Sequence, residues 1–321
     1  MPRYWIQISP EVKSAYFADY IEVAQQEWMY VFPNVEPEIR HIGPLVFFDV
    51  NHEHINSTDI MRLSFAQGIF EMPVEKERDG LRPCDTSADF RLHEDFVFGS
   101  KFKGKTNERL TQMLLNLGLS TIGTSGDENV KVLDPMCGRA TTLLWALRYG
   151  ISAKGLEQDR KSIEDVHRML KKWSKIHKQK HQLNEGHVGG GMKKKDGRFL
   201  EFRTNDTSLK LVTGDARSAD AIFRQEKFDL IISDLPYGVQ HTTRDKTKNP
   251  MAVLRECASP WKRCLKENGA MVLAFNRNNP KRDDLVDIFE NEKLTALPFS
   301  APHRMSESIV RDVVIFTPAT T

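Results

Sequence analysis

The stretch VKVLDPMCGRATTLL, residues 130–144, decides how this chain folds. An apolar run stops at Asp134, a turn containing Gly138 follows, and apolar residues then recur at helical spacing. A glycine lets the backbone approach a ligand closely, and the helix after it presents free N–H groups. Because the turn lacks the G-x-G-x-x-G pattern, it does not predict a dinucleotide site. The stretch predicts a strand, a ligand-binding turn and a helix, in that order.

The same alternation continues along the chain. Further strand candidates are ISAKGLEQD, LKLVTGDAR, FDLIISD, GAMVLAFN and VRDVVIFTP, and helical patterns separate them. Strands that alternate with helices predict a mostly parallel sheet covered on both faces, an α/β fold. Ligands of such sheets bind beyond the carboxyl ends of the strands. Four of these strands end in an acid, so we expect four carboxylates along one rim: Asp134, Glu157, Asp215 and Asp234.

The length of 321 residues fits about two domains of average size. Residues 1–95 mix short strand-like runs with helical stretches, which predicts a small α+β domain that binds RNA or positions the substrate. Residues 96–321 are predicted to form the α/β domain, with a basic flexible insertion near 174–200.

The composition excludes several classes of protein. With 40% apolar and 28% charged residues, the chain is typical of globular rather than disordered or membrane proteins. No window approaches the roughly 18 apolar residues of a membrane span, and the start lacks the apolar core of a signal peptide. A cytoplasmic protein without membrane contact is therefore expected. The four cysteines show no C-x-x-C pair, which favours reduced thiols. His177, His181 and His187 have no cysteine or supporting acid nearby, so no metal is predicted.

Charge is unevenly distributed. The net charge of +2 is too small to indicate nucleic-acid binding, but residues 168–198 contain ten Lys or Arg and only two acids. This bias predicts either contact with RNA phosphates or a solvated loop. The candidate phosphate-binding residues are Lys193, Lys194, Lys195 and Arg198.

The spacing of the rim acids favours a nucleoside ligand. Glu157 lies 19 positions after Gly138, where a doubly wound nucleotide site places an acid for the ribose hydroxyls. Asp215 can accept a hydrogen bond from an adenine amino group, and Ala216 offers a backbone donor beside it. The pattern fits an adenosine that carries an amino acid rather than a phosphate, which is S-adenosyl-L-methionine. Each acid alone can equally be a turn or helix cap, but four in register favour a ligand site.

The stretch SDLPYG, residues 233–238, predicts a site for a planar amino group. Proline holds the residue before it extended, which fixes the direction of the Leu235 carbonyl. The Asp234 carboxylate and this carbonyl can accept both N–H groups of the amine, while the Tyr237 ring offers a stacking face. Such hydrogen bonds stabilise the positive charge that develops on nitrogen during methyl transfer. A plain strand-ending turn is the alternative. The predicted catalytic residues are Asp234, Leu235, Pro236 and Tyr237.

In this order, TNERLTQMLLNLG, VLDPMCGRATTLL, GLEQD, GDAR and SDLPYG resemble the catalytic domain of the RNA methylase family. The likeness runs from about residue 92 to 317, and the most similar relatives methylate the exocyclic amino group (N2) of guanosine in tRNA, usually with a THUMP domain attached. The resemblance implies a class I S-adenosylmethionine-dependent methyltransferase, Rossmann-like, with a seven-stranded sheet whose last strand, VRDVVIFTP, is antiparallel. It implies that Asp234 to Tyr237 hold the target base. The predicted cofactor-binding residues are Asp134, Pro135, Met136, Gly138, Glu157, Gln158, Asp215, Ala216 and Asp234.

The chain departs from the family pattern at three places. Leu235 replaces a frequent proline, and because only its carbonyl is used we expect activity to survive. Arg139 stands where a small residue often follows the glycine. No THUMP domain is recognisable in residues 1–95. By the same analogy, Cys137 is a small packing residue rather than a nucleophile.

The sequence alone does not decide which molecule accepts the methyl group. The same acid and carbonyl suit an amino group of DNA adenine, of rRNA or of a protein glutamine, and fold alone does not exclude a non-catalytic RNA-binding or partner protein. Intact acids at every expected position favour an enzyme. The expected partners are RNA, above all tRNA, and a small activator subunit such as some relatives require.

Overall fold

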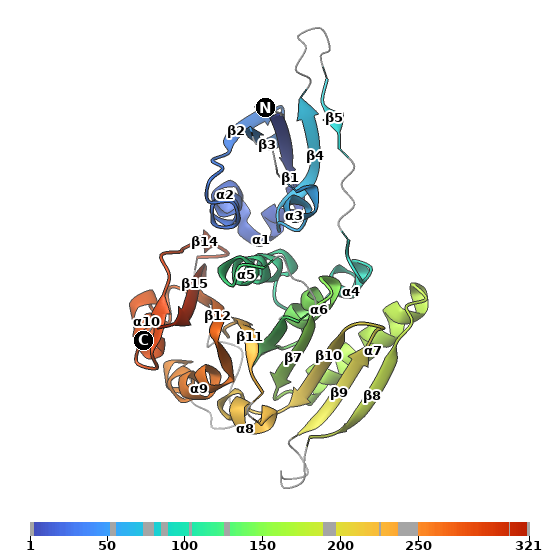
Figure 1. The fold of residues 1–321 in the computed structure, drawn as a ribbon, viewed down its shortest axis with the longest axis vertical. Helices are drawn as coiled ribbons and strands as arrows, with labels where there is room; N and C mark the ends of the chain where they lie inside the picture. The colour runs from blue at the N-terminus through green and yellow to red at the C-terminus, as the bar shows by residue number, and fades with distance from the viewer. Residues whose placement is uncertain are drawn as a thin grey trace.

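The computed structural model describes residues 3–51, 56–72, 80–84, 89–102, 105–124, 129–188, 197–224, 226–236, 250–307 and 309–319. Strands from these residues form two sheets, one from the first 83 residues and one from residues 131–318. The two sheets lie one above the other along the long axis of the molecule, with a helix of the chain between them (Figure 1).

The N-terminal sheet is antiparallel, with the strand order β2-β3-β1-β4-β5. Its strands are β1 (Arg3–Ile8), β2 (Glu38–Ile42), β3 (Leu45–Asn51), β4 (Ala66–Met72) and β5 (Arg82–Pro83). The helices of this region are α1 (Lys13–Tyr16), α2 (Tyr20–Val31) and α3 (Ser57–Met61), with short 3₁₀ turns η1 (Pro10–Val12) and η2 (Phe17–Asp19). Trp28, Phe48 and Phe65 are fully buried beneath them, so this region has an α+β core of its own.

Two helices connect the sheets, α4 (Asp95–Phe98) and α5 (Glu108–Thr121). The side chain of Asn107 starts α5 by accepting hydrogen bonds from the amides of Arg109 and Leu110. Every residue from Leu110 to Leu119 is buried, because α5 packs against α2 on one side and against α6, β11 and β12 on the other. A helix buried all round joins the two regions into one packed body.

The second sheet has the order β13-β15-β12-β11-β6-β7-β10-β9-β8, with β14 paired to β15. The strands are β6 (Lys131–Asp134), β7 (Ser152–Glu157), β8 (Gln182–His187), β9 (Arg198–Arg203), β10 (Ser208–Thr213), β11 (Phe228–Asp234), β12 (Leu265–Asn276), β13 (Leu294–Ala296), β14 (His303–Arg304) and β15 (Val310–Pro318). The helices are α6 (Thr141–Arg148), α7 (Arg160–Ile176), η3 (Ala216–Ser218), α8 (Ala219–Phe223), α9 (Pro250–Cys264) and α10 (Arg282–Glu290). The central strands β10, β7, β6, β11 and β12 are parallel, and β15 is antiparallel to β12. The last strand thus has the direction that the resemblance implies.

Within the described residues, the sheet has ten strands rather than the expected seven, because β8 and β9 at the basic insertion and the short strand β14 are added to it. Helix α7 continues to Ile176, and β8 and β9 form an antiparallel hairpin that extends the sheet beyond β10. The described ends of the insertion are therefore regular structure, whereas a flexible segment was expected. Strand β8, QLNEGH, carries no apolar alternation because it is an edge strand with mostly exposed side chains. None of the described helices is both long and apolar enough to cross a membrane.

Candidate active site

Asp134 ends β6 at the centre of the rim and is only 3% exposed. Its carboxylate accepts hydrogen bonds from the Met136 amide at 3.1 Å and from the Ser233 hydroxyl at 2.9 Å. Burial raises the pKa of Asp134 to about 7, opposed by hydrogen bonds from Thr142, Met136 and Ser233. Sequence reasoning missed Ser233, although it directly precedes Asp234 at the end of the neighbouring strand β11. The hydroxyl of Ser233 ties the ends of β6 and β11 together.

The turn after β6 exposes its backbone. Gly138 has a φ of +51°, and a Cβ built on it would meet no other atom within 4 Å. Ala140, with a φ of +62°, precedes α6, and no side chain among the described residues caps the first amides of this helix. A left-handed turn that opens onto space and leads to uncapped amides is suited to binding a polar ligand.

The turn lies closely on β7 because residue 155 is glycine. The amide and thiol of Cys137 both donate to the Leu156 carbonyl, at 3.0 and 3.1 Å. A Cβ on Gly155 would come within 2.7 Å of the Cys137 sulfur. Burial raises the pKa of the Cys137 thiol well above its ordinary value, which matches the packing role expected of this residue.

Glu157 ends β7 and lies at the same rim. Burial raises the pKa of this half-buried carboxyl, while hydrogen bonds from the amides of Asp159, Gln158 and Gly138 oppose the rise. The Asp159 amide is 2.6 Å from Glu157 Oε1. The contact with Gly138 brings the acid of the second strand to the turn of the first.

Asp215 follows β10 and is engaged by its own neighbour. Its carboxylate accepts from the Arg217 amide at 2.9 Å and from the Arg217 guanidinium, with 2.6 Å between Oδ2 and Nη2. Arg217 also pairs with Glu256 at 2.9 Å. This pairing was not foreseen, although GDAR contains both residues. Any hydrogen bond from an adenine amino group to Asp215 must share the carboxylate with Arg217 or displace it.

Asp234 ends β11 beside Asp134, close enough that its charge raises the pKa of Asp134. Arg311 of β15 lies 3.4 Å from Asp234 Oδ2, and both side chains are at most 10% exposed. The Leu235 amide donates to the Ala274 carbonyl at 2.8 Å, which continues the β11–β12 ladder and fixes the backbone before Pro236. Tyr237 lies outside the described residues. Sequence reasoning missed Arg311, because 77 residues separate it from Asp234.

The remaining residues singled out in the sequence are the basic phosphate-binding candidates and the three histidines. Lys193, Lys194 and Lys195 lie outside the described residues, whereas Arg198 is exposed at the start of β9. The Gly197 amide donates to the Thr213 carbonyl at 2.8 Å, so this end of the hairpin lies at the rim formed by the end of β10. The three histidines do not gather: His177 pairs with Asp95 at 2.8 Å and stacks on His93, while His181 stacks on Phe202.

Comparison with known proteins decides the family. Residues 104–297 match the family described as RMKL-like, methyltransferase domain, which covers more than half of the chain. The chain belongs to this methyltransferase family. No curated protein sequence matches it.

The fold of this methyltransferase is similar to that of TrmN from Thermus thermophilus, with a TM-score of 0.51 and 11% identity over 99% of this chain and 100% of TrmN. A methyltransferase from Pyrococcus furiosus gives a TM-score of 0.44 at 13% identity, over 71% of this chain and 93% of that one. A TehB-like S-adenosylmethionine-dependent methyltransferase from Corynebacterium glutamicum gives 0.38 at 15% identity, over 66% and 97%. The family match and the likeness to TrmN confirm the class I methyltransferase fold and the RNA methylase resemblance. S-adenosyl-L-methionine, the methyl donor of this class of methyltransferase, is the cofactor.

Proposed function

We propose that this methyltransferase transfers a methyl group to the exocyclic amino group (N2) of a guanosine in tRNA. The observation that carries the proposal is the position of Asp234 at the end of β11, next to Asp134 and directly before Leu235, whose amide is held by the Ala274 carbonyl. Membership of an RNA methylase family supports RNA as the acceptor. The need for two hydrogen-bond acceptors supports an NH2 group.

The rim fits S-adenosyl-L-methionine by the chemistry of its groups. When bound, the cofactor supplies a methyl group on a positively charged sulfur. The open turn at Gly138 and the amides of α6 can bind polar atoms, and the Glu157 carboxylate can accept from ribose hydroxyls. The residues proposed to hold the cofactor are Asp134, Pro135, Met136, Gly138, Glu157, Gln158, Asp215, Ala216 and Asp234.

Asp234 and Leu235 would act on the amine together. The carboxylate accepts one N–H and the Leu235 carbonyl accepts the other, which directs the nitrogen lone pair away from both acceptors. The negative charge of Asp234 stabilises the positive charge that develops on nitrogen, and the carboxylate can then take the proton. Arg311 orients this carboxylate from β15. Tyr237 is proposed, from the sequence alone, to stack on the base.

Basic residues beside the rim would bind the RNA backbone. Arg198 is exposed at the rim end of the β8–β9 hairpin, next to Gly197, whose amide donates to the Thr213 carbonyl. Lys193, Lys194 and Lys195 are proposed as phosphate contacts from their charge.

The acceptor is tested by incubating the protein and labelled S-adenosyl-L-methionine with total tRNA, total rRNA, DNA and protein. Nucleoside and amino-acid mass spectrometry then identifies the methylated product. We expect N2-methylguanosine in tRNA. Methyladenine in DNA, methylguanosine in rRNA or methylglutamine in protein would keep the chemistry and contradict the substrate. If no acceptor is labelled, adding a cell extract separates a missing activator subunit, which restores the label, from a non-catalytic protein.

The catalytic role is tested by Asp234→Asn, which keeps the shape of the side chain and removes its charge. We expect turnover to fall by about 100-fold or more, while cofactor affinity measured by calorimetry changes only a few-fold. Asp229→Asn is the matched control, because Asp229 lies at the opposite end of β11 and binds Lys266 at 2.7 Å. Retained turnover in Asp234→Asn would contradict the assignment.

A further inference from the structure

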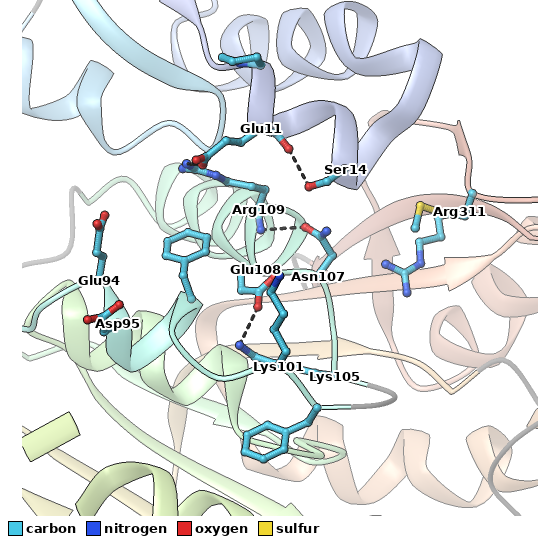
Figure 2. Close-up of a pocket in the computed structure, with 14 residues that line it drawn as sticks. Glu11, Ser14, Glu94, Asp95, Lys101, Lys105, Asn107, Glu108, Arg109 and Arg311 are labelled. Carbon is cyan, nitrogen blue, oxygen red and sulfur yellow. Dashed lines mark hydrogen bonds and ion pairs between the residues drawn. The ribbon is translucent and has the colours of Figure 1, made fainter. Parts of the chain in front are cut away.

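A pocket of about 740 Å³ opens where the N-terminal region meets the methyltransferase domain. The residues that line it fall within three stretches of the chain, 10–14, 94–109 and 305–311. Figure 2 shows Glu11 and Ser14 approaching from the N-terminal helices, Lys101 and Lys105 from the connecting segment, and Arg311 from β15. The volume lies within the range of about 300–1,000 Å³ that is usual for small-molecule sites.

The pocket reaches the proposed catalytic acid through one side chain. Arg311 lines the pocket, and its Nη2 is 3.4 Å from Asp234 Oδ2. A group bound in this pocket would therefore be a neighbour of the base whose amine contacts Asp234.

The lining offers aromatic rings rather than a strong field of one sign. Arg109 lies 4.9 Å from the centre of the Phe98 ring, and Arg139 lies 5.3 Å from the centre of the Phe102 ring. Unstacked bases of single-stranded RNA bind on such rings and on guanidinium planes.

The charges in the lining are largely compensated. Lys105 pairs with Glu108 at 2.6 Å, and Arg109 pairs with Glu11 at 2.8 Å. A compensated, aromatic lining suits an uncharged base better than a phosphate group.

We propose that this pocket binds an unstacked base of the RNA next to the target guanosine, and that the N-terminal region forms one of its walls. This inference rests on the proposed function in taking RNA as the substrate.

The N-terminal wall of the pocket is held in place by contacts across the junction between the two regions. The Tyr30 hydroxyl is 2.9 Å from that of Thr121, and the Arg304 amide donates to Asp19 at 2.8 Å. The N-terminal region thereby becomes part of the substrate site.

Blocking the pocket from its N-terminal wall tests the proposal. Ser14 is exposed and its hydroxyl donates to the Glu11 carbonyl at 2.7 Å, so Ser14→Trp fills the pocket without touching the catalytic acid. Lys13→Trp is the matched control, because Lys13 is exposed one residue away and is not among the described lining residues. We expect Ser14→Trp to weaken binding of total tRNA in a filter assay by about tenfold, the loss expected for one stacked base. Lys13→Trp should match the wild type, and both variants should bind S-adenosyl-L-methionine as the wild type does.

A second variant removes the ring but keeps the apolar bulk. Phe98→Leu should also weaken tRNA binding, by about fivefold, with cofactor affinity unchanged. Equal tRNA affinity in wild type, Ser14→Trp and Phe98→Leu would overturn the proposal. Loss of cofactor affinity in Ser14→Trp would assign the pocket to the cofactor and overturn it as well. The methyl-transfer assay with labelled S-adenosyl-L-methionine tests the proposed function separately. If both pocket variants weaken tRNA binding but the wild type produces no methylated guanosine in tRNA, the proposed function is contradicted while the assignment of the pocket to an RNA base stands.

Discussion

Among single residues, Asp134 couples the site to pH. Its pKa of about 7 in the folded protein lies above the ordinary value of about 3.9 that it takes in the unfolded chain. Folding therefore favours the protonated carboxyl. The contribution to stability is fully present below pH ~4 and is lost as the pH rises through about 7.

Asp134→Asn removes this titration and keeps an oxygen that accepts from Met136 and Ser233. Between pH ~4 and ~7 we expect the wild type to lose stability relative to the variant, by at most about 1.4 kcal/mol per pH unit. Urea denaturation at several pH values measures the difference. Asp206→Asn, at an exposed turn, is the control and should track the wild type. If the free energies of unfolding of wild type and Asp134→Asn change with pH in parallel, the assignment of Asp134 as a carboxyl that is buried and protonated in the folded protein is contradicted.

At the scale of elements, the strand–turn–helix unit from β6 to α6 depends on a glycine in the neighbouring strand. A Cβ at position 155 would lie within 3.0 Å of Cys137 and Leu143, so the turn that carries Gly138 must move to admit it. We expect Gly155→Ala to cost about 1–3 kcal/mol in stability and to weaken cofactor binding. Gly68→Ala is the control, since its Cβ would make only an ordinary contact of 3.6 Å with Phe70. Calorimetry with S-adenosyl-L-methionine that gives equal affinities for wild type and Gly155→Ala would contradict this account of the turn.

The same elements explain how much the sequence could predict. Strand ends marked by Asp134, Glu157 and Asp234 were predictable, because parallel strands in this fold bring their carboxyl ends to one rim. The β8–β9 hairpin was not, since an edge strand with exposed side chains carries no periodic signal. The contact of Arg311 with Asp234 was not predictable either: the resemblance implies an antiparallel last strand, but the register that brings Arg311 to Asp234 depends on a long-range contact. Local patterns predicted the elements and their acids, whereas the long-range contacts Ser233–Asp134 and Arg311–Asp234 depend on how distant elements pair.

For the whole molecule, the junction between the two sheets is organised by a buried acid. Glu27 of α2 accepts hydrogen bonds from the Ser64 amide at 3.0 Å and from the Asn116 amide group of α5 at 2.7 Å. The Tyr149 hydroxyl, at the end of α6, donates to Asn116 at 2.9 Å. Burial raises the pKa of Glu27, and the same hydrogen bonds oppose the rise. The N-terminal region and the methyltransferase domain thus share one polar network inside an apolar interface.

Removing the acid should loosen both regions together. Glu27→Ala leaves the Ser64 and Asn116 donors buried without their acceptor, so we expect a loss of about 3 kcal/mol in a single urea transition. Glu22→Ala, exposed on the same helix, should change stability by no more than about 0.5 kcal/mol. Two separate transitions in the wild type would contradict the shared core. Because α5 carries both Asn116 and the pocket residue Arg109, the loosened protein should also bind tRNA more weakly while its affinity for S-adenosyl-L-methionine changes less.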